Sequence, residues 1–204
     1  MYIPAHFREG EIAALHEMMR QNSFATLVTV VENVPFATHL PILLDAETLP
    51  GILRGHVARA NPQWQHFESG GEALVIFSGP HAYISPQWYK TQPSVPTWNY
   101  TAVHAYGSPR IVTGEALRKS LFDLTAFYEA GLPASWNPAE LPDDYLEKMT
   151  RALVGFEMPI SRLEGKSKLS QNRSETDRQQ VIAALESSGL AENVALAAEM
   201  RKRS

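Results

Sequence analysis

The sequence predicts an α+β protein in which a small antiparallel sheet or barrel is surrounded by helices. Short segments rich in β-branched residues fill most of the first half of the chain, and most helical segments follow them. The short connections between the first three strands favour antiparallel pairing over βαβ units. With 204 residues, 44% of them hydrophobic, we expect a single domain over 1–204, with 174–204 as a C-terminal helical extension.

The first half of the chain opens with a helix over 9–21, because Ile12, Leu15 and Met19 recur at helical spacing. Pro41 interrupts the second strand and indicates an edge or a bulge, since proline cannot donate to a ladder. Asn61 and Pro62 open a further helix as cap and first residue. Strands are expected at 23–31, 36–44, 51–58, 72–77 and 82–84.

The second half begins with a loop over 91–100 that is rich in proline and aromatic residues. A stripe of leucines predicts a long helix next, and Ser174 with Asp177 forms a capping box for a later one. The expected helices are 115–130, 143–153, 174–187 and 191–203. The expected strands are 101–106, 110–113 and 155–169.

Composition excludes several classes of protein. The chain has no cysteine, so disulfides, thiolate metal sites and thiol catalysis are excluded. The longest apolar run is 73–77, far below the roughly 20 residues of a membrane span. No secretory signal is visible, so a cytoplasmic location without membrane association is expected. The net charge of −4 disfavours a general attraction to DNA.

One cluster of polar residues follows the second and third strands. Thr38 and His39 lie on the second strand, and His56, Arg59 and Asn61 follow the third. Paired strands bring such groups together beside a helix start, where a guanidinium and free N–H groups suit phosphate oxygens. The alternative is that Arg59 pairs with a surface carboxylate while the histidines fill a partly buried seam.

Two further clusters have similar alternatives. Trp98 and Asn99 offer a ring that stacks on a planar ligand and an amide that binds its edge, or they pack in a core or subunit interface. Lys168, Gln171 and Arg173 lie in a donor-rich segment without an acid. That segment suits an anion, or it is a solvated strand end that leads to a helix cap.

Other chemistries find little support in the sequence. No two histidines have metal-ligand spacing, and no nucleotide-binding glycine motif is present. The two last helices are arranged like a helix-turn-helix, but Glu192 stands where a recognition helix needs donors. Direct reading of DNA by this pair is therefore disfavoured, and no metal is expected.

Six segments in order resemble the PaiB family over nearly the whole chain. They are Met1-Tyr2-Ile3-Pro4 with His6-Phe7, Thr38-His39-Leu40-Pro41, Gly55-His56-Val57-Ala58-Arg59-Ala60-Asn61-Pro62, Gly79-Pro80-His81-Ala82-Tyr83-Ile84-Ser85-Pro86, Val95-Pro96-Thr97-Trp98-Asn99-Tyr100 and Lys168-Leu169-Ser170-Gln171-Asn172-Arg173. The family is described as FMN-binding negative transcriptional regulators. Its fold is similar to the flavin-binding split barrel, so the resemblance implies a split barrel that forms a homodimer with FMN at the subunit interface.

The resemblance also implies roles for individual residues. By analogy with the fold, the ribityl phosphate of FMN is held by Thr38, His39, His56, Arg59 and Asn61. Leu40 and Val57 offer backbone groups to the isoalloxazine edge, and Trp98 and Asn99 close the ring pocket. Further donors come from Lys168, Gln171 and Arg173.

Two other functions are consistent with the same residues. One is a flavin-dependent oxidoreductase or flavin reductase, although no catalytic acid, base or nucleophile stands out near the expected ring. The other is a heme-binding split-barrel protein, since histidine is plentiful. A DNA or protein partner for regulation has weak support in the sequence.

Overall fold

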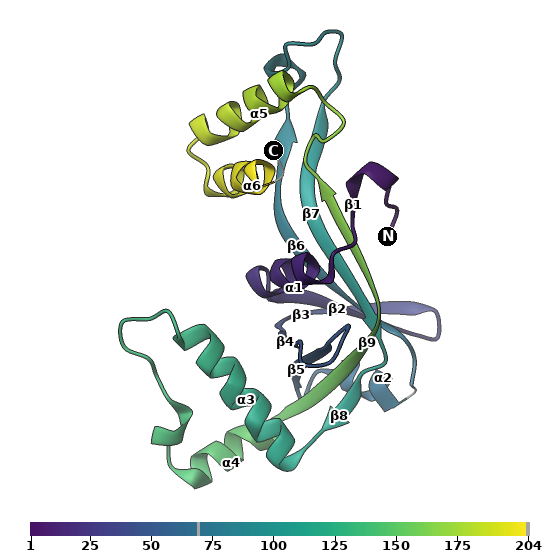
Figure 1. The fold of residues 1–204 in the computed structure, drawn as a ribbon. Coiled ribbons are helices and arrows are strands. Elements are labelled where there is room, and N and C mark those ends of the chain that lie inside the picture. The colour runs from purple at the N-terminus through teal and green to yellow at the C-terminus, as the bar shows by residue number, and fades with distance from the viewer. Residues whose placement is uncertain (69, 203–204) are drawn as a thin grey trace. The chain divides into compact units, whose positions relative to one another are not determined.

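The computed structural model describes residues 1–68 and 70–202 (Figure 1). The chain divides into two compact units. Unit 1 consists of Met1–Gln21, Ser78–His104 and Glu164–Ser204, and unit 2 of Asn22–Phe77 and Ala105–Leu163. Three long strands contribute residues to both units, and each unit is described here by itself.

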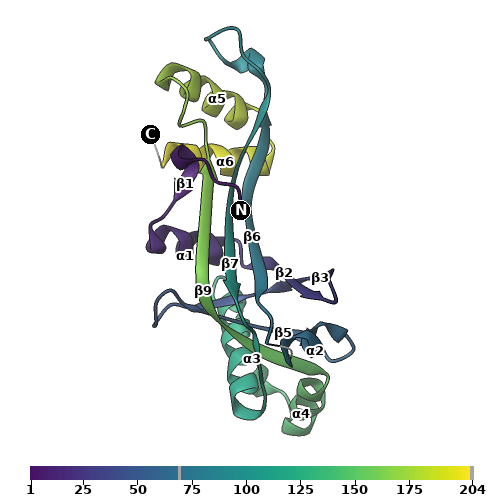
Figure 2. The ribbon, with the colours of Figure 1, turned by 90° about the vertical axis from the view of Figure 1, so that its right-hand side faces the viewer.

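The described residues form nine strands, and β1–β9, β2–β3, β2–β6, β4–β5, β5–β9 and β8–β9 are antiparallel pairs. The strands are β1 (Arg8–Glu9), β2 (Phe24–Val31), β3 (Val34–Pro41), β4 (Leu43–Asp45), β5 (Ile52–Ala58), β6 (Ala73–Ile84), β7 (Thr97–Gly107), β8 (Arg110–Val112) and β9 (Leu153–Lys168). Their order is β3-β2-β6-β7-β9-β5-β4, with β1 and β8 also paired to β9. Figure 2 shows β7 between β6 and β9. The α+β antiparallel fold predicted from the sequence is confirmed.

Six α-helices accompany these strands in the described part of the chain. They are α1 (Ile12–Gln21), α2 (Gln65–Glu68), α3 (Gly114–Glu129), α4 (Asp143–Arg151), α5 (Glu175–Ser187) and α6 (Ala191–Arg201). Short 3-10 turns are η1 (Ala5–Phe7), η2 (Pro62–Trp64), η3 (Pro86–Trp88) and η4 (Pro138–Glu140). The expected helices are present with shifted ends. None of the described helices is long and apolar enough to cross a membrane.

The strand predicted over 36–44 is divided in two. β3 ends at Pro41, and β4 starts again at Leu43 and pairs with β5 instead. β3 comes first in the strand order, so the edge position that Pro41 indicated is confirmed. The expected run of three neighbouring strands is wrong, because β5 pairs with β9 rather than with β3.

The prediction of two separate strands over 72–77 and 82–84 is also wrong. β6 continues through Gly79 and Pro80 to Ile84. A Cβ at Gly79 would lie 2.0 Å from Oγ1 of Thr101 on β7, so only glycine permits this close approach of the strands. β7 likewise begins at Thr97, inside the segment predicted as a loop. These strands extend beyond their predicted ends because they contact residues that are distant in sequence.

Unit 1 has a core formed by its two last helices and the strand ends beside them. Ile84, Leu169, Val181 and Leu196 are fully buried in this cluster, which Figure 1 shows as α5 and α6 beside β6. Asp177 connects α5 to the proline-rich loop, because its Oδ1 accepts the N–H groups of Lys90 at 2.8 Å and Thr91 at 3.1 Å. The N–H of Thr91 is the main cause of a lowered pKa for Asp177.

Unit 2 has its own core on the buried faces of β2, β5, β6 and β9. Leu27, Leu53 and Phe156 have no exposed surface there. The ring of Phe67 from α2 lies 5.2 Å from the ring of Phe156, measured between centroids. The short helix α2 is therefore held on the sheet by aromatic packing.

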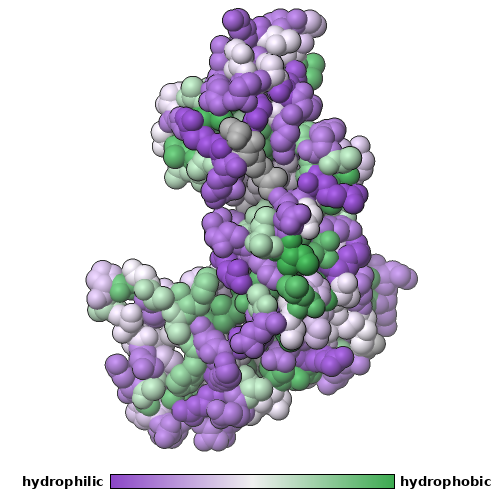
Figure 3. Space-filling model, in the orientation of Figure 1, coloured by the Kyte–Doolittle hydropathy of each residue, from purple (hydrophilic) through white to green (hydrophobic). Residues whose placement is uncertain are grey.

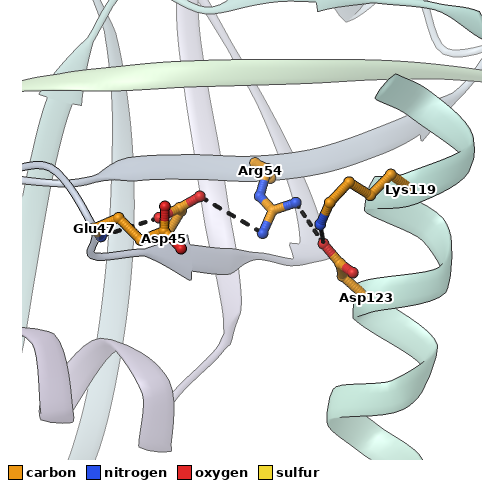
Figure 4. Close-up of polar contacts among 5 residues, drawn as sticks. All are labelled: Asp45, Glu47, Arg54, Lys119 and Asp123. Carbon is orange, nitrogen blue, oxygen red and sulfur yellow. Dashed lines mark hydrogen bonds and ion pairs between the residues drawn. The ribbon is translucent and has the colours of Figure 1, made fainter. Parts of the chain in front are cut away.

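A charged cluster connects α3 to the sheet of unit 2 (Figure 4). Arg54 of β5 donates from Nη1 to Oδ2 of Asp123 at 2.7 Å, and its Nη2 lies 3.9 Å from Oδ2 of Asp45. Nζ of Lys119 donates to the same oxygen of Asp123 at 2.7 Å. Burial alone would raise the pKa of Asp123, but the hydrogen bonds from Lys119 and Arg54 outweigh it and the pKa is lowered.

A prediction follows for the replacement Asp123→Asn. A lowered folded-state pKa contributes stability above the unfolded pKa, and this contribution is lost as the pH falls through the folded pKa. At neutral pH we expect Asp123→Asn to reduce the free energy of unfolding by about 1 kcal/mol. The difference from wild type should vanish in acid, measured by urea unfolding across pH. Asp144→Asn, an exposed carboxylate, is the control; a deficit that persists unchanged below the ordinary Asp range would contradict the assignment.

Candidate functional site

Asn61 and Thr38 form the centre of the candidate site in unit 2. Nδ2 of Asn61 donates to Oγ1 of Thr38 at 2.9 Å, which joins the turn after β5 to β3. Oδ1 of Asn61 accepts the N–H of Gln63 at 3.0 Å, so Asn61 caps η2 as the sequence predicted. The main-chain N–H of Gln63 is occupied by this cap. A ligand beside the start of η2 would therefore contact the side chains of Thr38 and Asn61 rather than the N–H of Gln63.

Gln63 fixes this arrangement, and sequence reasoning missed it. Its side chain has no exposed surface. Nε2 lies 3.1 Å from the carbonyl oxygen of Leu27, 3.1 Å from Oγ1 of Thr29 and 3.2 Å from the carbonyl oxygen of Phe36. One amide group thus attaches η2 to both β2 and β3. A lone glutamine has no local pattern that could have revealed this role.

Arg59 is held by the main chain beside α4. Nε donates to the carbonyl oxygen of Arg151 at 2.8 Å, and Nη2 donates to that of Leu153 at 3.0 Å. The remaining N–H groups of the guanidinium take no part in these two bonds. The carbonyl oxygen of Arg59 accepts the indole N–H of Trp64 at 3.0 Å. Among residues 1–68 and 70–202, no carboxylate pairs with Arg59, as the alternative had required.

The two histidines of the cluster have different surroundings. His39 is exposed on the opposite face of β3 from Thr38, and its Nδ1 lies 2.9 Å from Oγ1 of Thr26. His56 is half-buried on β5, and burial lowers its pKa, which favours the neutral ring at neutral pH. His56 therefore offers an uncharged donor or acceptor rather than a cation.

Leu40 and Val57 have buried side chains, with exposed fractions of 4% and 3%. Leu40 stands opposite Ala25 in the β2–β3 pair, and Val57 stands opposite Val154 in the β5–β9 pair. Any part that these two residues play in binding must come from their main-chain groups, as the resemblance implied. That assignment stays a prediction.

In unit 1, Trp98 and Asn99 point to opposite faces of β7. Trp98 is 53% exposed and its ring centroid lies 6.2 Å from His81 and 6.1 Å from Tyr83. Asn99 is fully buried, and its Nδ2 donates to Oγ of Ser170 at 2.9 Å. Trp98 is thus available for stacking, whereas Asn99 is engaged in the core of this unit.

The donor-rich segment at the end of β9 is largely occupied by local contacts. Nε2 of Gln171 donates to the carbonyl oxygen of Ser167 at 2.5 Å and so closes the turn. The guanidinium of Arg173 lies over the ring of Tyr89 at 4.4 Å. Nζ of Lys168 donates to Oγ1 of Thr97. Burial, with a smaller effect of Lys166, lowers the pKa of Lys168.

Lys166 is a buried cation beside this segment that was not among the predicted site residues. It is 7% exposed, and its Nζ lies 5.0 Å from the ring centroid of Tyr100 and 5.6 Å from that of Tyr2. Nζ also donates to the carbonyl oxygen of Tyr2 at 3.1 Å. Its alternation with Lys168 along β9 was the available signal, because residues two apart share one face of a strand.

Solved structures with a similar fold define the class. The FAD and heme binding protein of Mycobacterium smegmatis aligns with a TM-score of 0.65 and 17% identity, over 87% of this chain and 79% of that one. The flavocytochrome of Azotobacter vinelandii aligns with a TM-score of 0.65 and 13% identity, over 87% of this chain and 78% of that one. These likenesses concern the fold, which is the antiparallel split-barrel type expected from the resemblance.

Sequence comparison then identifies the family. Residues 1–162 match the family described as "Putative FMN-binding domain", and the chain belongs to this family. It is 39% identical to the protease synthase and sporulation protein PAI 2 of Bacillus subtilis, over 91% of this chain and 89% of that protein. An uncharacterized protein of Aspergillus fumigatus is 32% identical, over 100% of this chain and 97% of that protein. The expected family is confirmed.

A prediction follows for Gln63→Leu, which keeps the apolar volume and removes the amide. Buried acceptors on β2 and β3 would lose their partner, so we expect the free energy of unfolding to fall by about 1–3 kcal/mol. Chemical denaturation followed by circular dichroism measures the change. Gln65→Leu, at an exposed neighbouring position, is the control. Equal stability of Gln63→Leu and wild type would refute the role of the amide.

Proposed function

We propose that this protein binds FMN through Thr38, Arg59 and Asn61 and acts as a homodimeric negative transcriptional regulator, with flavin at the subunit interface. The single observation that supports the binding site is the hydrogen bond from Asn61 to Thr38. Asn61 lies two residues after Arg59 in the chain. The family description indicates the identity of the ligand. The fold holds the hydroxyl of Thr38, the amide of Asn61 and the guanidinium of Arg59 through the contacts described above.

The donor set suits a phosphorylated ligand. Thr38, His39, His56, Arg59 and Asn61 include no carboxylate, and Arg59 carries a permanent positive charge. In this proposal the phosphate is bound by Arg59, and the hydroxyl and amide of Thr38 and Asn61 orient polar groups of the ligand. Bound flavin supplies a reversible acceptor of electrons, which makes the state of the protein depend on redox conditions.

Unit 1 has a separate group of residues proposed to contact a ligand. Trp98 is exposed beside His81 and Tyr83, which makes it the aromatic surface best suited to a flat ring. Lys168 is the proposed cation of this group. Asn99, Gln171 and Arg173 position the surrounding chain through the contacts already described.

Exposed apolar side chains support the homodimer. Phe24 and Val30 lie on one face of β2 and are 68% and 57% exposed. Exposed apolar groups on one face commonly mark an interface between proteins. In the proposed assembly, equivalent surfaces of two chains meet about a twofold axis.

Features of α6 favour regulation through ligand or protein contacts over direct reading of DNA. Leu196, Ala197 and Met200 are buried in the core of unit 1, and Glu192 near the start of the helix pairs with His81 at 2.9 Å. A helix that reads the major groove presents donors at its N-terminal end. The name of the Bacillus subtilis relative refers to protease synthase and sporulation. We propose that this chain affects gene expression.

The binding proposal predicts the effect of Arg59→Ala on FMN affinity. Loss of a charge-assisted hydrogen bond should weaken binding by about 1.5–3 kcal/mol, which is roughly ten- to a hundredfold in Kd. Equilibrium dialysis measures Kd, and circular dichroism checks the fold. Thr38→Val tests the same site without touching the carbonyl partners of Arg59. Arg110→Ala, at an exposed position, is the control. Unchanged affinity in folded Arg59→Ala and Thr38→Val would remove both residues from the site.

The regulatory proposal predicts that deletion of the gene raises a set of transcripts, because a repressor is lost. Wild type should restore repression and Thr38→Val should not, as measured by RNA sequencing. The purified protein should sediment as a dimer that persists on dilution and should not turn over NAD(P)H steadily with added FMN. Steady turnover with unchanged transcripts would favour the flavin-dependent oxidoreductase, and a compact FMN-binding monomer would contradict the dimer.

A further inference from the structure

A cavity between α3 and α4 of unit 2 is lined by none of the residues proposed to bind flavin, although one lining residue, Leu153, supplies a carbonyl oxygen to Arg59. Its volume is about 410 Å³, within the range of small-molecule sites. Leu121 and Phe122 come from α3, Leu146 and Met149 from α4, and Trp136 from the segment before η4. A second hollow of about 510 Å³ adjoins it and shares Trp136, Leu146 and Met149.

The chain leaves the walls of this cavity incompletely covered. No residue of α4 is buried, and Trp136 and Met149 are 47% and 41% exposed. Figure 3 shows apolar surface among hydrophilic side chains in the region of α3 and α4. An apolar ligand would therefore remove aromatic and aliphatic surface from water, which is the main favourable contribution to binding at such sites.

The charged residues that line the cavity determine whether a cationic or an anionic ligand is favoured. Its charged lining residues are Glu115, Arg118 and Glu147. Arg118 is already paired with Asp143 at 3.5 Å and lies over the ring of Phe122 at 5.3 Å. Glu147 is paired with Arg151 at 3.0 Å. Within the described residues Glu115 forms no ion pair, so its exposed carboxylate in the first turn of α3 is available to a ligand cation.

We propose that this cavity binds an amphipathic organic cation, whose apolar body lies between α3 and α4 and whose amine or quaternary ammonium group is directed to Glu115. Phe122 and Trp136 add favourable contact with a cation through their ring faces. An anionic ligand of the same shape would meet Glu115 and find Arg118 occupied. The charge arrangement thus distinguishes ligands that the apolar walls alone would accept equally.

Three probes that share one apolar body test the proposal: 4-phenylbutylamine, 4-phenylbutyrate and 4-phenylbutanol. Isothermal titration calorimetry on the full chain should give saturable one-to-one binding of the amine. Its affinity should exceed that of the butyrate by about tenfold, since an ionic contact and a cation–π contact favour only the amine. The neutral alcohol should fall between them.

Two variants test the contribution of the apolar cavity and that of the Glu115 charge separately. Thr125→Phe fills the cavity from α3 and should abolish binding of all three probes, with the fold checked by circular dichroism. Glu115→Gln should weaken the amine and leave the alcohol unchanged, whereas Glu11→Gln, just before α1, should change neither. FMN affinity should be the same in every variant, so failure here is distinguishable from failure of the flavin proposal.

Four results would overturn the proposal. The first is no saturable binding of the amine at millimolar concentration. The second is equal affinity for the amine and the butyrate. The third is binding that Thr125→Phe leaves intact. The fourth is a dimer that Trp136→Ala dissociates in sedimentation, because that result would assign this surface to a second copy of the chain.

Discussion

The buried amide of Gln63 is the constraint on which the candidate site of unit 2 depends. A primary amide has two N–H groups, and here they face three acceptors on β2 and β3, so one hydrogen is shared. Its Oε1 is buried without a hydrogen-bond partner among the described residues. The fold accepts that cost because the same side chain fixes η2, and with it the cap residue Asn61, against the edge of the sheet.

The polar groups around this amide differ in how firmly they are held. Asn61 is constrained twice, by its cap bond to Gln63 and by its bond to Thr38. Arg59 is constrained by two carbonyl oxygens at the end of α4. A binding group that is already ordered loses little conformational freedom when a ligand arrives, which favours affinity. His39, exposed at the far face of β3, lacks such support apart from its contact with Thr26.

Local signals predicted much of the fold and part of the site. The cap at Asn61, the edge position of Pro41 and the six helices were predictable, because each depends on neighbouring residues or on periodicity. The passage of β6 through Gly79 was not predictable, since it follows from the close approach of Thr101 on another strand. The same limit applies to Gln63, whose partners are far away along the chain. The family resemblance identified FMN as the expected ligand. Periodicity and composition alone did not indicate a particular ligand.

Trp64 gives the candidate site an optical property of its own. Its indole N–H is bonded to the carbonyl oxygen of Arg59, within the turn that also carries Asn61. Indole emission shifts in wavelength with hydrogen bonding, and a yellow isoalloxazine absorbs the light that indoles emit. The protein therefore contains an intrinsic fluorophore beside the residues proposed to hold phosphate, so titration with flavin needs no attached label.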